Sequence, residues 1–143
     1  MGVCITATNS SIEFKTSYGM FHRLRCNIAK AIDEEFAVLY HKATAFVYEA
    51  DGIEAERELN NYLTKNYDYI SHVDEVLNFL FQSDVEGKVN YKTCRKILEL
   101  IDHINFENEN FQYVSNRTSE NDYEVFKKFL KECIKYHRDM RWY

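Results

Sequence analysis

Two cysteine–histidine pairs in this sequence share one spacing. His22 precedes Cys26 by four residues, and Cys133 precedes His137 by four. Residues four apart lie on one face of an α-helix, and thiolate and imidazole are ligands that zinc prefers. Two such helices packed together would offer a Cys2His2 zinc site. The same pairs could place a thiolate beside an imidazole for nucleophilic chemistry, although no third orienting group is identifiable. Small buried cysteines and ordinary histidines are the alternative interpretation.

The segment FQSDVEGKVNY resembles a calcium-binding loop in part. Aligned with the EF-hand pattern, Gly87 takes the invariant turn position, and Asp84 and Glu86 take two liganding positions. Gln82 and Thr93 then occupy the first and last positions, so two of the required carboxylates are missing. The sequence therefore leaves calcium binding at Asp84 and Glu86 as the minor alternative.

An acidic turn without an ion is the other interpretation of this segment. Gly87 would then take a left-handed backbone conformation, and residues 88–91 would form a short extended piece. Asn90 would cap the helix that follows.

Charge is distributed unevenly along the chain. Residues 1–30 carry four Lys/Arg against one acid, residues 31–126 carry eight against twenty, and residues 127–143 carry six against two. If the termini meet in space, they could form one basic, aromatic surface suited to phosphates or to an acidic protein patch. Its predicted binding residues are Arg23, Arg25, Lys127, Lys131, Arg138, Arg141 and Trp142. Alternatively, the lysines simply solvate the last helix and complement its dipole.

Length and composition indicate one globular domain over residues 1–143. The chain is 45% hydrophobic and 15% aromatic, with no proline and four glycines, so no linker or repeat is evident. We expect no membrane span, no secretory leader and a cytoplasmic location. Four cysteines without C-x-x-C spacing suit reduced thiols. No nucleic-acid-binding signature and none of the common catalytic motifs occurs.

The N-terminal residues alternate as paired strands do. VCITAT and SIEFKT flank a turn at Asn9-Ser10, which predicts a β-hairpin. The same residues match a myristoylation pattern at Gly2, with Cys4 placed for a second acyl chain. A strand paired from its first residues would not present its end to a lipid transferase, so the hairpin is favoured.

The rest of the chain reads mainly as helices. The periodicity predicts one long helix after Ser17 that reaches Leu39, and a helix at 53–65. Further helices are predicted at 73–81 with Ser71 as cap, at 93–104, and at 123–137 with Ser119 as cap. Residues 110–115 alternate like a strand, and the tail MRWY predicts an edge strand. The expected fold is α+β, a small antiparallel sheet covered by four or five helices.

Several stretches together resemble a group of small uncharacterised proteins of bacteria and their phages. They are GVCITATNSSIEF, SYGMFHRLR, FQSDVEGKVNYKTC and the terminal MRWY. In that group the acidic turn reads Ser-Asp-x-Asp/Glu-Gly, which residues 83–87 match. The resemblance implies a setting and no known activity or catalytic residues.

The resulting prediction is a non-enzymatic binding protein. In the setting of the resemblance, it would inhibit a bacterial defence system through a host protein partner. One alternative is an oligomeric sponge that sequesters a small nucleotide-like anion. Another is a Cys/His metal-binding protein or enzyme. The favoured prediction and the sponge require no cofactor. Zinc at the cysteine–histidine pairs and calcium at the acidic turn are the minor alternatives, and no interpretation requires a membrane.

Overall fold

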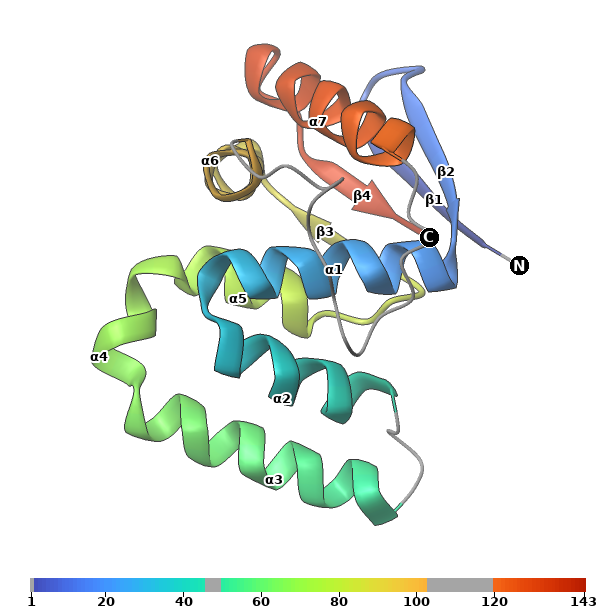
Figure 1. The fold of residues 1–143 in the computed structure, drawn as a ribbon. Helices are drawn as coiled ribbons and strands as arrows, with labels where there is room; N and C mark the ends of the chain where they lie inside the picture. The colour runs from blue at the N-terminus through green and yellow to red at the C-terminus, as the bar shows by residue number, and fades with distance from the viewer. Residues whose placement is uncertain (1, 46–49, 103–119) are drawn as a thin grey trace.

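The computed structural model describes residues 2–45, 50–102 and 120–143. Its elements are β1 (Gly2–Ala7), β2 (Glu13–Ser17), α1 (Tyr18–Ile32), α2 (Glu34–Ala45), α3 (Ala50–Lys65), α4 (Tyr67–Ile70), a 3-10 turn (Ser71–Val73), α5 (Asp74–Phe81), β3 (Gly87–Val89), α6 (Tyr91–Ile101), α7 (Glu120–Lys135) and β4 (Met140–Trp142). The predicted α+β class, a small antiparallel sheet covered by helices, is confirmed (Figure 1). None of the described helices is long and apolar enough to cross a membrane.

The N-terminal hairpin forms as the alternation predicts. β1 and β2 pair antiparallel, with Val3 opposite Thr16 and Ile5 opposite Phe14. Asn9 allows the tight turn because it adopts a positive φ of 57°, a conformation that asparagine tolerates better than most residues. Val3, Ile5 and Phe14 are buried, so one face of the hairpin joins the core.

The C-terminal strand lies inside the sheet. The strand order is β2-β1-β4-β3, so β4 has a partner on each side. The prediction of an edge strand at MRWY is therefore wrong in position, although the strand itself exists. Met140 and Trp142 are fully buried, and a backbone at that depth needs hydrogen-bond partners along both of its edges. The two ends of the chain consequently lie side by side in one sheet.

Helices cover one face of the sheet. The inward side chains of the strands are Val3, Ile5, Ala7, Phe14, Val89, Met140 and Trp142. From this face, Phe14 contacts Phe126 of α7 with ring centroids 6.3 Å apart, and Trp142 contacts Phe21 of α1 at 5.8 Å. Figure 1 shows α1 and α5 between the sheet and the α2–α3 pair. The α2–α3 pair thus extends the helical part away from the sheet.

The long helix predicted after Ser17 is two helices. Asp33 is extended, with φ −167° and ψ 133°, and it ends α1. Its carboxylate accepts a hydrogen bond of 2.9 Å from the backbone N–H of Phe36, so it also caps α2. Two glutamates follow in the first turn of α2, where negative charge is favoured. The apolar periodicity continues across the break because α2 folds back and buries its own apolar face.

Other helix ends match the predictions only in part. Asn90 caps α6 as predicted, because its side chain accepts from the backbone N–H of Thr93 at 3.0 Å. Ser71 does not cap the next helix, because its hydroxyl donates to the carbonyl of Asp68 and α5 begins without a side-chain cap. The predicted strand at 110–115 and the cap at Ser119 lie outside the described residues.

Candidate functional site

A cleft of about 410 Å³ lies among α1, α2, α3 and the end of α5. Its lining residues are His22, Arg25, Tyr40, Ala43, Thr44, Glu56, Leu59, Asn60, Leu80, Phe81, Gln82 and Asp84. This volume is in the range of small-molecule sites, and the walls combine apolar side chains with a few polar ones. The cleft is therefore a candidate ligand site.

Three potential metal ligands meet on one side of the cleft. His22 Nε2 lies 3.2 Å from His41 Nδ1, and Cys26 Sγ lies 3.6 Å from His22 Nε2 and 3.8 Å from His41 Nδ1. His22 and Cys26 are one turn apart on α1, and His41 comes from α2. Within the described ranges, this is the one group of three or more His, Cys, Asp or Glu side chains with all ligand atoms within 4.8 Å.

Burial controls the protonation of this His22–Cys26–His41 cluster. Desolvation, with a smaller contribution from His41 and Arg25, lowers the pKa of His22 to about 4. Desolvation also lowers the pKa of His41. Burial raises the pKa of the Cys26 thiol to about 12, against the opposing charge of Arg25. The cluster therefore consists of two neutral imidazoles and a protonated thiol at neutral pH when nothing is bound.

Arg25 was predicted to bind a ligand or partner from the surface, but it is only 3% exposed. Its guanidinium donates to the carbonyls of Phe79 at 2.5 Å and Gln82 at 2.7 Å, and lies over the rings of Phe21 and Phe79. Carbonyls at the end of a helix lack intrahelical donors, and the helix dipole favours a cation there. Arg25 thus fixes the end of α5 and the start of the acidic turn.

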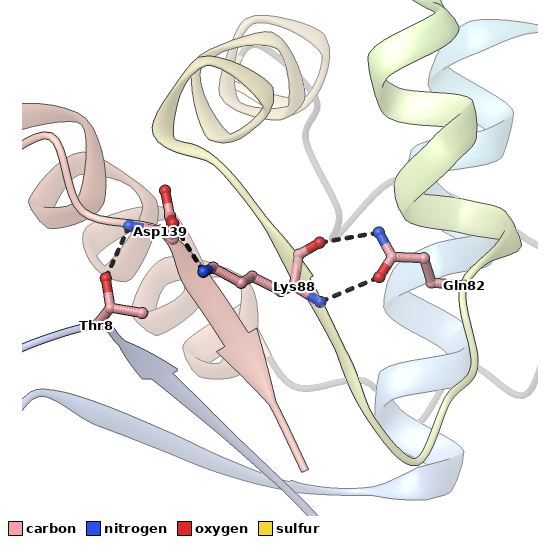
Figure 2. Close-up of polar contacts among 4 residues, drawn as sticks. All are labelled: Thr8, Gln82, Lys88 and Asp139. Atoms are coloured by element: carbon pink, nitrogen blue, oxygen red, sulfur yellow. Dashed lines mark hydrogen bonds and ion pairs between the residues drawn. The ribbon is translucent and has the colours of Figure 1, made fainter.

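The acidic turn is closed by its own side chains. The Gln82 amide accepts from the backbone N–H of Lys88 and donates to the Lys88 carbonyl, each at 3.0 Å (Figure 2). The Lys88 ammonium also reaches Asp139 at 3.3 Å, and the Asp139 backbone N–H donates to the hydroxyl of Thr8. These contacts tie the turn to β3 and to the residue before β4.

Gly87 serves packing rather than a left-handed turn. The prediction of a left-handed backbone there is wrong, because no described glycine has a positive φ. A Cβ at this position would come within 2.0 Å of the Trp142 ring, so glycine is needed for the close approach of β3 to that indole. Of the two predicted calcium ligands, Asp84 lines the cleft, and Glu86 does not. Neither belongs to a described group of potential metal ligands.

The second Cys–His pair is dispersed. Cys133 on α7 is hydrogen-bonded to the thiol of Cys94 on α6, a contact that raises the pKa of Cys94. His137 stacks on the ring of Tyr91, with centroids 4.4 Å apart. Cys133 and His137 are not within ligand distance of His22 and Cys26. The structure therefore does not assemble the four-residue site suggested by the matching spacings.

The remaining predicted binding residues do not share one surface role. Trp142 is buried, and its Nε1 donates to the carbonyl of Ser83 at 2.9 Å. Lys127 is mostly buried and donates to the carbonyl of Asp102, and Arg138 donates to the carbonyls of Thr8 and Asn9. Arg23 is half-buried beside Met20, whereas Lys131 and Arg141 are exposed. The termini do meet, but three of the seven predicted side chains (Arg25, Lys127 and Trp142) are internal.

Sequence reasoning missed His41, Glu56 and Asn60. His41 has no cysteine or histidine within one helical turn, so no spacing pointed to it. The available signal was Asp33 followed by two glutamates, which is typical of a helix start. Placing a helix break there would have folded His41 back toward His22.

Comparisons with known proteins leave the site to be judged on its own geometry. No family model matches the sequence, and neither the curated proteins nor the solved structures contain a match.

Proposed function

We propose that this is a binding protein whose ligand site is the cleft among α1, α2, α3 and the acidic turn. The observation that carries the proposal is the set of polar side chains on the cleft walls. Glu56 and Asn60 of α3 and Asp84 of the turn line the cleft, and no hydrogen bond or ion pair within the described part of the chain engages these three side chains. Polar groups without partners at a concave site are ready to bind a ligand.

The chemistry of these walls favours a small molecule with a positive charge and hydrogen-bond donors. Glu56 and Asp84 are carboxylates, which accept hydrogen bonds and attract cations. The Phe81 ring, which is half-exposed on the cleft wall, offers a face for a cation–π contact. Arg25 also lines the cleft, and its positive charge acts on Asp84, so it weakens this preference. It does not reverse the preference, because the two carboxylates outnumber the one guanidinium, which is held by carbonyls and aromatic rings.

This ligand class differs from the anion suggested by the basic termini. A sponge for a nucleotide-like anion would need free cations at the site, and the one described arginine of the cleft wall has the structural contacts given above. Inhibition of a bacterial defence system through a host protein stays a prediction. A cleft that sequesters a small signalling molecule would be compatible with the same setting.

A thermal-shift panel tests the cleft proposal. The cationic probes are a linear diamine, a polyamine and free arginine; the anionic probes are inorganic phosphate and ATP. A bound probe at 100 times its Kd should stabilise the fold by about 3 kcal/mol. We expect a response to at least one cationic probe and none to the anions. A response to the anions alone would overturn the proposal and favour the sponge for an anionic molecule.

Matched variants locate the response. The double variant Glu56→Gln, Asp84→Gln removes both cleft carboxylates and should abolish it. Glu58→Gln lies on the same helix and Glu86→Gln in the same turn, and neither residue lines the cleft. This control pair should leave the response unchanged. Retention of the response in the first double variant would place the ligand elsewhere.

A further inference from the structure

We infer that His22, Cys26 and His41 bind a divalent transition-metal ion of zinc type. The inference does not depend on the cleft ligand, because it rests on other side chains apart from His22, which also lines the cleft. It differs from the Cys2His2 site considered from the sequence, since its third ligand is His41 of α2.

The distances between the three ligand atoms match those of a zinc site. With Zn–N bonds of about 2.0–2.1 Å, Zn–S of about 2.3 Å and tetrahedral angles, two nitrogens lie about 3.3 Å apart and a nitrogen and a sulfur about 3.6 Å apart. The observed separations are 3.2 Å between the nitrogens, and 3.6 and 3.8 Å between sulfur and nitrogen. One ion can therefore contact all three atoms without a rearrangement of the helices.

Hydrogen bonds among His22 Nε2, His41 Nδ1 and Cys26 Sγ satisfy these three atoms poorly. A neutral imidazole nitrogen either carries a proton or offers one lone pair, so it cannot donate to one neighbour while accepting from another. His22 Nε2 and His41 Nδ1 each face both of the other ligand atoms. In any protonation state, at least one proton or lone pair must then be shared between two partners. A cation at the centre would accept one lone pair from each atom.

The surrounding structure fits an ion held between two helices. Cys26 is fully buried, and His22 and His41 are half-buried, so the site is close to the surface but enclosed on its protein side. The two imidazoles are neutral at neutral pH, which is the ligand form. An ion here would join α1 to α2 directly beside the cleft wall and thereby fix the position of His22.

The donor set selects the class of metal. Two imidazoles and one thiolate suit Zn²⁺, Co²⁺ and copper, whereas Ca²⁺ and Mg²⁺ require oxygen ligands. Zn²⁺ is the first choice because it accepts tetrahedral nitrogen–sulfur coordination without any redox requirement. Binding of the ion would deprotonate the Cys26 thiol and release that proton to water.

The test uses the full chain freed of metal with a chelator and then dialysed. Zn²⁺ titration followed by native mass spectrometry should show one ion per chain. Co²⁺ should give a thiolate-to-cobalt charge-transfer band together with the visible bands of tetrahedral Co²⁺. Ca²⁺ and Mg²⁺ at the same concentration should give neither a mass adduct nor a thermal shift. Absence of a stoichiometric Zn²⁺ or Co²⁺ complex would overturn the inference.

Variants assign the ligands. Loss of an outer-shell partner typically weakens metal binding 10- to 100-fold, so loss of a direct ligand in Cys26→Ser or His41→Gln should weaken Zn²⁺ binding by at least about 100-fold. The thiolate-to-cobalt band should disappear in Cys26→Ser and persist in the controls Cys133→Ser and His137→Gln. Circular dichroism of each variant shows whether it folds. If Cys26→Ser does not fold, His41→Gln tests the assignment instead, because His41 is only half-buried. Zn²⁺ affinity unchanged in a folded His41→Gln variant would contradict the assignment.

Discussion

His22–Cys26 and Cys133–His137 have the same spacing, yet among the residues that the structure describes only the first pair meets a third potential ligand. His22 and Cys26 lie in the middle of α1, and their ligand atoms are 3.6 Å apart with His41 beside both. In the second pair, Cys133 contacts Cys94 and His137 stacks on Tyr91. The same two residue types at the same separation therefore produce different local chemistry.

The end of α7 explains the difference. His137 has a positive φ of 50°, and α7 ends at Lys135. The backbone N–H of Arg138 bonds to the carbonyl of Cys133, and that of His137 to the carbonyl of Ile134. This is the Schellman arrangement, in which the residue after the helix turns into the left-handed conformation. His137 therefore leaves the helical face that Cys133 occupies.

A spacing of four residues thus has chemical meaning only inside a continuous helix. It also needs a further element to supply the remaining ligand. At the first pair α2 supplies it, because the chain folds back at Asp33. In one uninterrupted helix the 19 residues from His22 to His41 would span about 28 Å, rather than the observed 3.2 Å between their ring nitrogens.

Replacing Cys26 or Cys133 should give the largest difference in zinc-dependent stability between the two cysteine–histidine pairs. Cys26→Ala and Cys133→Ala should each lose about 1 kcal/mol of packing. Zinc at 1,000 times the Kd of the unmodified chain should stabilise that chain by about 4 kcal/mol, and a 100-fold weaker affinity in Cys26→Ala should remove at least about 2.7 kcal/mol of this, whereas Cys133→Ala should keep it. Urea unfolding in zinc and in chelator measures both contributions. Equal zinc dependence in the two variants would remove the distinction drawn between the pairs.

Asp33→Ala tests the break between α1 and α2, which brings His41 to the first cysteine–histidine pair. The substitution removes the cap on Phe36 and the hydrogen bond of 2.5 Å from the Tyr62 hydroxyl, so we expect a loss of about 1–2 kcal/mol. Zinc affinity should fall with it, because α2 would be held less firmly against α1. Glu34→Gln is the control, since it removes only a favourable charge at the helix start, about 0.5 kcal/mol. Denaturant titration with and without zinc measures both quantities. Equal stability and equal zinc affinity in Asp33→Ala and Glu34→Gln would contradict this prediction.

Replacing His22 or His137 by glycine should change the stability of the metal-free protein least, but it should distinguish the two histidines by their effect on zinc binding. In metal-free protein, His22→Gly places glycine inside a helix and should lose about 1 kcal/mol. His137→Gly relieves a left-handed backbone but loses the stack on Tyr91, so its net change should be under about 1 kcal/mol. Zinc binding should be lost in the first and kept in the second. Calorimetric titration of both would show whether His137 is, contrary to this expectation, required.

Elsewhere in the fold, too, features that depend on neighbouring residues could be predicted from the sequence, whereas features that depend on distant residues could not. The hairpin and the Asn90 cap could be predicted because each depends on residues close in sequence. The break at Asp33 was missed because the apolar periodicity continues through it. The central place of β4 could not be predicted, since it depends on pairing between residues such as Ile5 and Trp142 at opposite ends of the chain.

The sequence by itself determined the α+β class, the hairpin and the shared helical face of His22 and Cys26. These features follow from short periodicities, which act over one or two turns of chain. Only the tertiary structure decided that His41 joins them, that Arg25 and Trp142 are internal, and that Glu56 and Asp84 border one cleft. Each of those outcomes depends on which apolar faces bury against one another, and that choice is made by the whole core rather than by any local segment.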